Sequence, residues 1–248
     1  MFGTRAHFDY RDARAVAQLG EWLSDTRLTF HSMHAPIFDA MKDGKWVGSF
    51  SNASANEERR KAAIAETQAA LQVAATLPYR FLVVHLGTPP VEQMPPRDNE
   101  WDAARRSVEE IAALAAAVNV KVALEVIPNP LSSAASLVRL IEDDLEGLDV
   151  GICLDYGHAH IMGDLAEAIE TLSGHLMTTH VHDNRGKQDD HLVPYAGSIN
   201  WDMAIMETQK IGYDDALMFE VADTGNPIEV LDRTAKARER LEKAFITF

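Results

Sequence analysis

The chain of 248 residues alternates short apolar runs with longer helical patterns, and this alternation constrains its fold more than any other feature. The short runs are rich in β-branched residues, as buried strands are. Because strands and helices alternate and the strands are apolar on both faces, a parallel sheet covered by helices is predicted. The runs predicted as strands are residues 27–33, 81–85, 120–126, 150–155, 177–182 and 216–221.

The intervening segments carry the spacing of apolar residues that is typical of helices. Asn200 before Trp201 and Asn226 before Pro227 are predicted helix caps. No glycine-rich GxGxxG fingerprint follows any predicted strand, which disfavours an open nucleotide-binding sheet and favours a closed α/β barrel. The predicted helices cover residues 12–23, 57–77, 101–118, 134–145, 164–172, 201–211 and the last stretch from Pro227.

The strand count falls short of a complete barrel. Eight strands are needed, and the sequence offers six clear ones plus a possible remnant at residues 1–5. We therefore expect an α/β fold of the TIM-barrel type that lacks the first βα unit. No Gly/Ser-rich linker or block of charge divides the chain, so residues 1–248 are predicted to form a single domain.

Composition excludes several classes of protein. The 23 Lys and Arg residues against 38 Asp and Glu give a formal charge of −15, which disfavours non-specific attraction to nucleic acid backbones. The lone Cys153 allows no internal disulfide. No apolar run approaches the roughly 18 residues of a membrane span, and the start lacks a signal-peptide pattern. A cytoplasmic protein with no membrane partner is expected.

A residue of the metal-ligating type stands at the carboxyl end of every predicted strand. In a parallel barrel those ends meet on one face, so the six side chains would share a pocket. Each alone has a structural interpretation, as a hydrogen-bonded histidine or an ion-paired carboxylate. Their recurrence at one position of six successive βα units instead predicts a metal centre. The six residues are His34, His85, Glu125, Asp155, His180 and Glu220.

The types of ligand narrow the choice of ion. Imidazoles mixed with carboxylates suit Zn²⁺, Mn²⁺, Fe²⁺ or Co²⁺ better than Ca²⁺ or Mg²⁺. The segments "LDYGH" and "DDH" add His158, Asp189 and His191, and nine ligands are too many for one ion. We expect one to three divalent ions per chain, most favourably Zn²⁺ or Mn²⁺. If only one ion is present, the histidines that do not bind it are expected to bind substrate.

Several motifs resemble those of the xylose-isomerase-like TIM-barrel superfamily, which includes sugar and sugar-phosphate isomerases and epimerases and the type IV AP endonucleases. The resemblance extends over nearly the whole chain, except for the family's first βα unit. The motifs are "HAP" at 34–36, "VVHLG" at 83–87, "LEVIPNP" at 124–130, "GICLDYGHAH" at 151–160, "HVHDN" at 180–184, "DDHLVPYAGSINW" at 189–201 and "FEV" at 219–221.

The isomerase branch of this family implies a metal ion held by Glu125, Asp155, His180 and Glu220. The two glutamates would act as catalytic residues, one removing a proton beside a carbonyl and the other returning it. The metal would stabilise the enediolate between these steps. His158 matches a residue that contacts substrate oxygen.

The endonuclease branch implies three zinc ions on nine residues, and all nine types are present in order. The negative charge, and the shortage of basic and aromatic residues in the strand-end loops, disfavour a DNA-bending enzyme. The loop after His34 offers Trp46 and suits a lid over a small ligand at least as well as a DNA wedge. The nine residues are His34, His85, Glu125, Asp155, His158, His180, Asp189, His191 and Glu220.

The favoured interpretation is a metal-dependent isomerase or epimerase of a small sugar, sugar phosphate or related polyol. The first alternative is a multi-zinc phosphodiesterase of the type IV AP endonuclease kind. The second alternative is a metal-binding protein with impaired or no catalysis. His182 and Asp183 are predicted to orient the ligands, with Lys187 a possible anion contact. Because an open barrel exposes unpaired strand edges, a homo-oligomer is expected.

Overall fold

The computed structural model describes residues 3–88 and 97–246, and its chain divides into two compact units. The boundary passes through two strands and one helix, and each unit is described by itself. The prediction of one domain over residues 1–248 stays a prediction. Unit 1 comprises Met1–Leu124, Asn129–Leu131 and Leu140–Gly151, and unit 2 comprises Glu125–Pro128, Ser132–Arg139 and Ile152–Phe248.

Six parallel strands confirm the six predicted from sequence, and their hydrogen-bonded order is β1-β4-β5-β6-β7-β8. The fold is α/β, a partial TIM barrel. Strands β4 and β6 are buried along their whole length, as expected for strands that are covered on both faces. The strands are β1 (Ser32–His34), β4 (Phe81–Val84), β5 (Lys121–Glu125), β6 (Val150–Asp155), β7 (Leu176–Val181) and β8 (Leu217–Phe219).

The predicted strand remnant at residues 1–5 is wrong for its described part. Residues 3–5 form bends and turns, since the Thr4 carbonyl accepts hydrogen bonds from the backbone N–H groups of His7 and Phe8 at 3.0 and 3.3 Å. A carbonyl used in such a local turn is not available to a strand ladder. Residues 1 and 2 lie outside the described residues.

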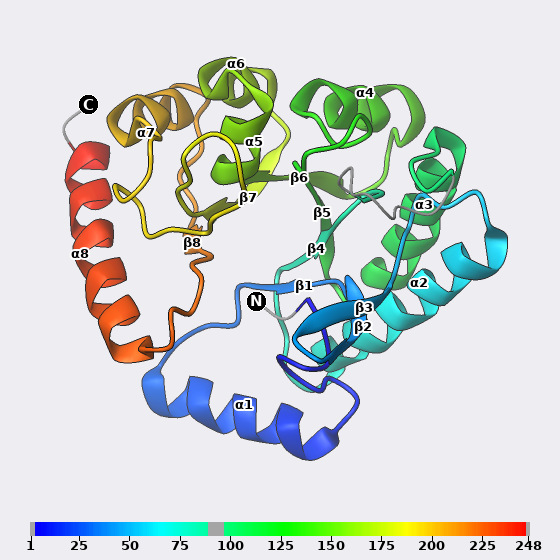
Figure 1. Ribbon diagram of the computed structural model, residues 1–248. Coiled ribbons are helices and arrows are strands. Elements are labelled where there is room, and N and C mark those ends of the chain that lie inside the picture. Colours follow the sequence, from blue (N-terminus) through cyan, green and yellow to red (C-terminus); the bar gives the residue numbers. More distant parts are fainter. Residues whose placement is uncertain (1–2, 89–96, 247–248) are drawn as a thin grey trace. The chain divides into compact units, whose positions relative to one another are not determined.

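In unit 1, helices α2 and α3 lie side by side (Figure 1). The buried guanidinium of Arg60 on α2 joins them, with hydrogen bonds to Ser107 at 3.3 Å and to Glu57 at 2.6 Å. A further contact of 2.8 Å pairs it with Glu110, so this buried cation has two carboxylate partners. The helical elements are α1 (Ala13–Thr26), α2 (Glu57–Leu71), the 3₁₀ turn η1 (Gln72–Ala75) and α3 (Trp101–Ala116), and α4 (Ala134–Asp144) spans the boundary between units.

A β-hairpin of unit 1 occupies part of the loop that the sequence analysis placed after His34. Strands β2 (Phe38–Lys42) and β3 (Lys45–Ser49) pair antiparallel around Asp43 and Gly44, whose φ angles are 50° and 72°. Two positive φ values are what a type I′ turn requires, and Asp-Gly is a favoured pair for it. This dipeptide is the sequence signal that would have predicted the hairpin.

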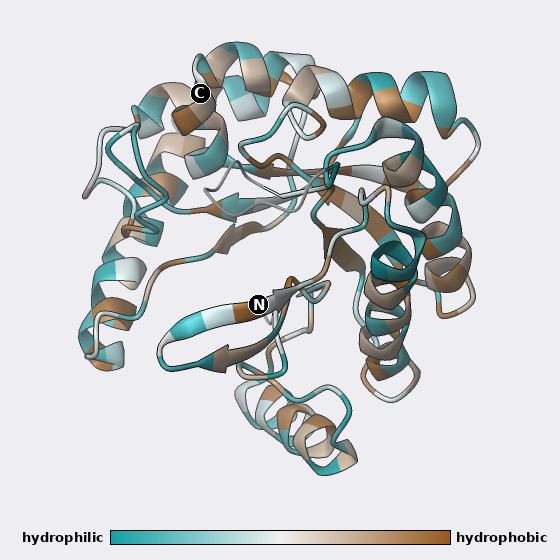
Figure 2. Ribbon diagram, turned by 45° about the vertical axis from the view of Figure 1, so that its right-hand side comes forward, coloured by the Kyte–Doolittle hydropathy of each residue, from teal (hydrophilic) through white to brown (hydrophobic). Residues whose placement is uncertain are grey.

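In unit 2, α6 packs on α7 and α7 on α8 (Figure 1). The predicted caps are confirmed, because Asn200 Oδ1 accepts from Met203 N at 3.2 Å and Asn226 Oδ1 from Glu229 N at 3.3 Å. The helices carry hydrophilic and hydrophobic residues in alternation (Figure 2). No helix in the described ranges is both long and apolar enough to cross a membrane. The helices are α5 (Tyr156–Met162), α6 (Leu165–Thr171), α7 (Trp201–Lys210) and α8 (Pro227–Ile246).

Helix α5 was not predicted from sequence. It begins immediately after β6, because the Asp155 carboxylate that ends the strand accepts a hydrogen bond from His158 N at 2.7 Å and caps the helix. No loop separates the strand from this helix, so the sequence offers no break at which a helix would be predicted. The cap places His158 one turn above the end of β6 and brings its side chain to the carboxyl end of the strands.

Candidate metal centre

Four residues of unit 2 form what we call the strand-end group: Glu125, Asp155, His180 and Glu220. Each offers one ligand atom, and these atoms all lie within 4.8 Å of one another. The register of parallel strands produces this arrangement, since Asp155 on β6 pairs with His180 on β7, and Glu220 follows β8. Three of the four side chains are almost fully buried.

The imidazole of His180 lies between two carboxylates. Its Nδ1 atom is 2.9 Å from Glu125 Oε1 and 3.2 Å from Glu220 Oε2. Burial by itself would lower the pKa of His180, but its contacts with Cys153 and Glu125 raise that pKa well above its ordinary value. A proton on His180 and a bound metal ion would compete for the same ligand atoms.

One buried oxygen of the strand-end group fits a cation. Glu220 Oε2 has no hydrogen-bond donor among the described residues, although His180 Nδ1 is within ion-pair distance of it. A buried carboxylate oxygen without a donor is costly unless a cation or water satisfies it. Together with one imidazole and two further carboxylates, this oxygen is a suitable donor set for Zn²⁺ or Mn²⁺.

A second set of four residues in unit 2 is named the loop-held group: His158, His182, Asp189 and His191. Their ligand atoms also lie within 4.8 Å of one another. Asp189 is central, with its Oδ2 3.2 Å from His158 Nε2 and 3.0 Å from His191 Nε2. The rings of His182 and His191 are stacked, with centroids 4.0 Å apart.

Backbone carbonyls orient two of these histidines. His158 Nδ1 donates to Val126 O at 3.1 Å, and His191 Nδ1 donates to Glu220 O at 3.0 Å. In both rings Nε2 is then directed at Asp189. Metal-binding histidines usually have this arrangement, in which one ring nitrogen donates to a carbonyl and the other binds the ion.

Electrostatic coupling within the loop-held group is strong. Burial lowers the pKa of His158, but the charge of Asp155 and the hydrogen bond with Asp189 raise it to about 10. The pKa of His191 rises to about 9 against the same opposing burial, through its hydrogen bond with Asp189. Burial would raise the pKa of Asp189, yet its hydrogen bonds with the two histidines hold that pKa well below its ordinary value.

His182 joins the loop-held group, whereas the sequence analysis predicted only an orienting role for it. Its Nε2 is 3.0 Å from Asp155 Oδ2 and 3.6 Å from Asp189 Oδ1, so it lies between the two groups. Its buried Nδ1 has no hydrogen-bond partner among the described residues. The ring packs closely on Gly157, where a Cβ atom would collide with it.

In unit 1, His34 and His85 lie next to each other, with ring centroids 4.7 Å apart and ring planes almost perpendicular. His34 Nδ1 contacts the carbonyl of Ala35 at 2.6 Å. The indole of Trp46 stacks on Phe38 within the hairpin, with ring centroids 5.7 Å apart. The roles predicted for His34, His85 and Trp46 stay predictions.

Lys187 and Asp183 belong to the segment that follows β7. Lys187 is exposed. Asp183 is fully buried, and its carboxylate accepts hydrogen bonds only from N–H groups of the chain around it, at 2.9 to 3.1 Å. The roles predicted for Asp183 and Lys187 stay predictions.

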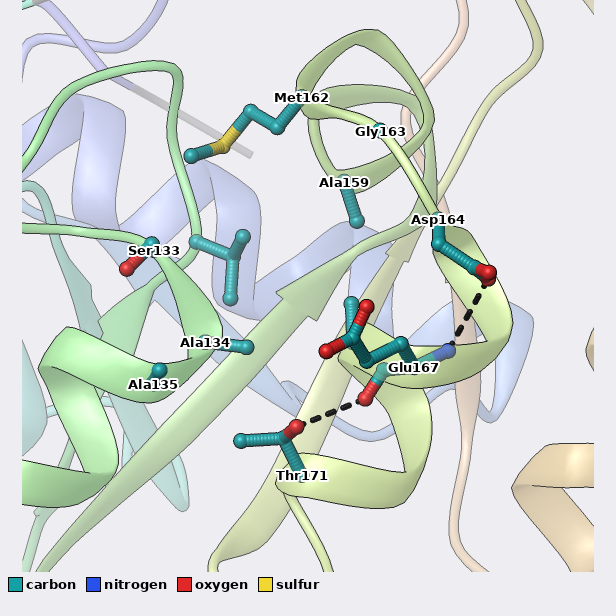
Figure 3. Close-up of a pocket in the computed structure, with 11 residues that line it drawn as sticks. Ser133, Ala134, Ala135, Ala159, Met162, Gly163, Asp164, Glu167 and Thr171 are labelled. Carbon is teal, nitrogen blue, oxygen red and sulfur yellow. Dashed lines mark hydrogen bonds between the residues drawn. The ribbon is translucent and has the colours of Figure 1, made fainter.

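A separate cavity of about 200 Å³ in unit 2 lacks this chemistry (Figure 3). It is lined mainly by small side chains from the start of α4, from α5 and from α6. Its polar residues serve the helix: Asp164 accepts from Glu167 N at 3.1 Å, and Thr171 donates to Glu167 O at 2.7 Å. No histidine lines this cavity.

The family of the chain follows from comparison with known proteins. The family model described as a xylose isomerase-like TIM barrel matches residues 1–244. The chain belongs to this xylose isomerase-like TIM-barrel family. This confirms the resemblance drawn from the motifs.

Relatives within the xylose isomerase-like family include one of unknown activity. An uncharacterized protein of Methanocaldococcus jannaschii is 29% identical over 195 residues, which are 76% of this chain and 63% of that protein. This chain thus matches less than two thirds of the length of that relative. The inosose isomerase of Bacillus subtilis (strain 168) is 24% identical over 228 residues, covering 86% of this chain and 79% of that protein.

Solved structures share the fold of this chain. A D-tagatose 3-epimerase-like protein has a TM-score of 0.76 and 25% identity, covering 95% of this chain and 86% of that chain. The IOLI protein, whose crystal structure has a bound zinc atom, has a TM-score of 0.75 and 18% identity, covering 94% of this chain and 83% of that chain.

Proposed function

We propose that this member of the xylose isomerase-like family is a divalent-metal-dependent isomerase or epimerase of a small sugar, sugar phosphate or related polyol. The observation that carries the proposal is the strand-end group, with two buried or half-buried glutamates around one histidine. The inosose isomerase and the tagatose-epimerase-like protein support the reaction class and a carbohydrate substrate. The zinc atom of the IOLI protein supports zinc.

The two glutamates would move the proton. Glu125, at 1% exposure, is held by His180. The Glu220 side chain is 24% exposed and has one oxygen for which the described residues supply no donor. A bound divalent cation would supply positive charge to the substrate oxygens whose negative charge develops as the proton leaves. In our proposal one carboxylate removes the proton beside the carbonyl, and the other, protonated beforehand, delivers a proton to the substrate carbon. Both carboxyl groups then exchange protons with solvent before the next turnover.

The test is proton exchange from ketoses in deuterated water, with a panel of free and phosphorylated sugars and with Zn²⁺ or Mn²⁺ added. Glu125→Gln and Glu220→Gln should each lower the exchange rate by about 10²–10⁴-fold, the usual contribution of a general acid or base. Glu167→Gln, in the separate cavity, is the matched control and should retain the full rate. Absence of exchange across the panel would refute the proposal.

Phosphodiester hydrolysis by a multi-zinc centre is the second candidate function, and the loop-held group favours it. That group could hold a further ion beside the strand-end group, and two neighbouring ions can stabilise the attacking and leaving oxygens of a phosphodiester. Cleavage of an oligonucleotide with one abasic site, lost in Glu125→Gln, would support this reading. Lack of cleavage with excess zinc would eliminate it.

Several further expectations remain predictions. Two predictions depend on which ions are bound. One is the nine-ligand set that includes His34 and His85, and the other is the contact of His158 with substrate oxygen. A homo-oligomer, a cytoplasmic location and an anion contact at Lys187 likewise stay predictions. Light scattering would test whether the protein forms a homo-oligomer.

A further inference from the structure

The loop-held group depends on a segment that folds around one buried carboxylate. We call residues 184–200 the metal loop, because it carries Asp189 and His191. At its base, Asp183 pairs with Leu192 through two backbone hydrogen bonds of 2.7 and 2.8 Å. The metal loop has no helix or strand of its own, so other contacts must define its conformation.

The Asp183 side chain supplies those contacts. It is completely buried, and no cationic side chain among the described residues pairs with it. Its two oxygens instead accept five N–H groups, enough to occupy the roughly four lone-pair sites of a carboxylate. The donors are Asn184 N at 2.9 Å, Tyr195 N at 2.9 Å, Gly197 N at 3.0 Å, Ile199 N at 3.1 Å and Trp201 Nε1 at 3.0 Å.

These five donors come from both ends of the metal loop. Asn184 begins it, whereas the Tyr195, Gly197 and Ile199 amides and the Trp201 indole come from its last turn and from the start of α7. One carboxylate thus closes the loop, and the two ligands lie between the closed ends. A backbone hydrogen bond from Ser198 N to Asn184 O, at 2.8 Å, also joins the two ends of the loop. Outside the loop, Ala222 N donates to His191 O at 2.9 Å.

We infer that Asp183 is a positioning residue that preforms the loop-held group, holding Asp189 and His191 opposite His158 and His182 before any ion binds. This inference rests on the proposed metal dependence of the site. A carboxylate is needed because every partner is a donor. An asparagine at this position would present its own N–H₂ group to N–H groups and leave donors unsatisfied.

Gly197 gives a second, independent way to disturb the same contact. A Cβ atom there would collide with Asp183 Oδ1 and with the carbonyl of Asn184. Gly197→Ala therefore pushes the metal loop away from Asp183 and leaves the carboxylate itself intact. Asp190→Asn is the matched control, since Asp190 lies in the same loop and its side-chain Oδ2 contacts Arg185, at 3.4 and 3.6 Å, and not Asp183.

The first measurement uses the metal-free chain of 248 residues. Arg185 and Lys187 are exposed trypsin sites within the metal loop. We expect Asp183→Asn and Gly197→Ala to be cut there at least about tenfold faster than the unaltered chain, and Asp190→Asn to be cut at the unaltered rate. Equal cleavage rates in Gly197→Ala and the unaltered chain would overturn the inference, even if Asp183→Asn does not fold.

The second measurement is zinc binding by equilibrium dialysis. Both variants should retain the ion of the strand-end group and lose that of the loop-held group, with affinity falling about 10–100-fold, as for other residues that orient ligands. Unchanged affinity at both positions would overturn the inference. If the unaltered chain binds no zinc or manganese, the proposed function fails, and the trypsin result still decides whether Asp183 preforms the loop.

Discussion

The strand-end group and the loop-held group offer similar ligands on different supports. Three of the strand-end residues are almost completely buried, and the hydrogen-bonded sheet sets their positions. In the loop-held group, Asp189 is 41% exposed, and its backbone is held by a loop closed on Asp183. The comparison teaches that the same chemistry can be fixed by a sheet at one position and by one buried carboxylate beside it. The two supports should respond differently to substitution.

The largest difference in zinc binding between the two groups is expected for His180→Asn, which removes the imidazole of the strand-end group. Loss of a ligand should weaken zinc binding there by more than about 100-fold, because even orienting residues contribute about 10–100-fold. Activity should fall at least as far, and the loop-held ion should remain. Zinc stoichiometry and ketose proton exchange measure both effects. Loss of both ions together would mean that the groups form one indivisible centre.

Asp189→Asn is the corresponding change in the loop-held group. It removes the charge that contacts His158 and His191 at 3.2 and 3.0 Å. We expect zinc affinity at this group to drop by about 100-fold, with the strand-end ion unaffected. Cobalt substitution followed by absorption spectroscopy would distinguish the two positions. An unchanged affinity at the loop-held group would show that Asp189 is not a ligand.

A smaller effect is expected for Gly157→Ala, which introduces a Cβ atom that collides with the His182 ring. Moving that ring should weaken its contacts with both Asp155 and Asp189. Overpacking of this kind costs about 1–3 kcal/mol of unfolding free energy, and zinc affinity should fall by about tenfold. Denaturant unfolding and zinc titration are the measurements. A selective loss at the loop-held group would identify His182 as part of that group rather than of the strand-end group.

The smallest expected effect is the pH dependence of the metal-free chain. His158 and His191 have pKa values raised to about 10 and about 9, above the ordinary value of 6.5. Their stabilising contribution is therefore complete below pH of about 6.5 and is lost as pH rises through about 9–10.

The melting temperature should fall by about 2–4 °C across that interval, which corresponds to about 1 kcal/mol in a chain of this size. Differential scanning fluorimetry would measure it, with Asp189→Asn as the control. That variant lacks the Asp189 charge, which raises the pKa of His191 and, together with Asp155, that of His158, so its melting temperature should change less. An equal fall in the two chains would assign the pH effect to other groups.

Much of the fold was predictable because it follows local rules. Buried strands in α/β proteins are continuous apolar runs, and helices have their own apolar period, so all six strands were found. The helix α5 was missed because it follows β6 without a loop and is capped by the last residue of that strand. The hairpin at Asp43-Gly44 was missed although its turn dipeptide was visible.

The candidate ligands at the strand ends were predictable for a related reason. In parallel strands the carboxyl ends face the same side, so Glu125, Asp155, His180 and Glu220 could be grouped before their distances were known. The place of His182 could not, since it depends on the close packing of its ring on Gly157. The strand-end residues were predictable because the period of the strand alone places their side chains, whereas the position of His182 depends on tertiary packing.

The sequence by itself determined the fold class, the family and the candidate ligands, because residue type and strand period are properties of the chain. Only the tertiary structure decided how those ligands divide into a strand-end and a loop-held group, and what supports the second. Asp183 illustrates the reason. Its five donors come from residues up to 18 positions away, and no periodic pattern relates them. Such contacts exist only once the loop has closed.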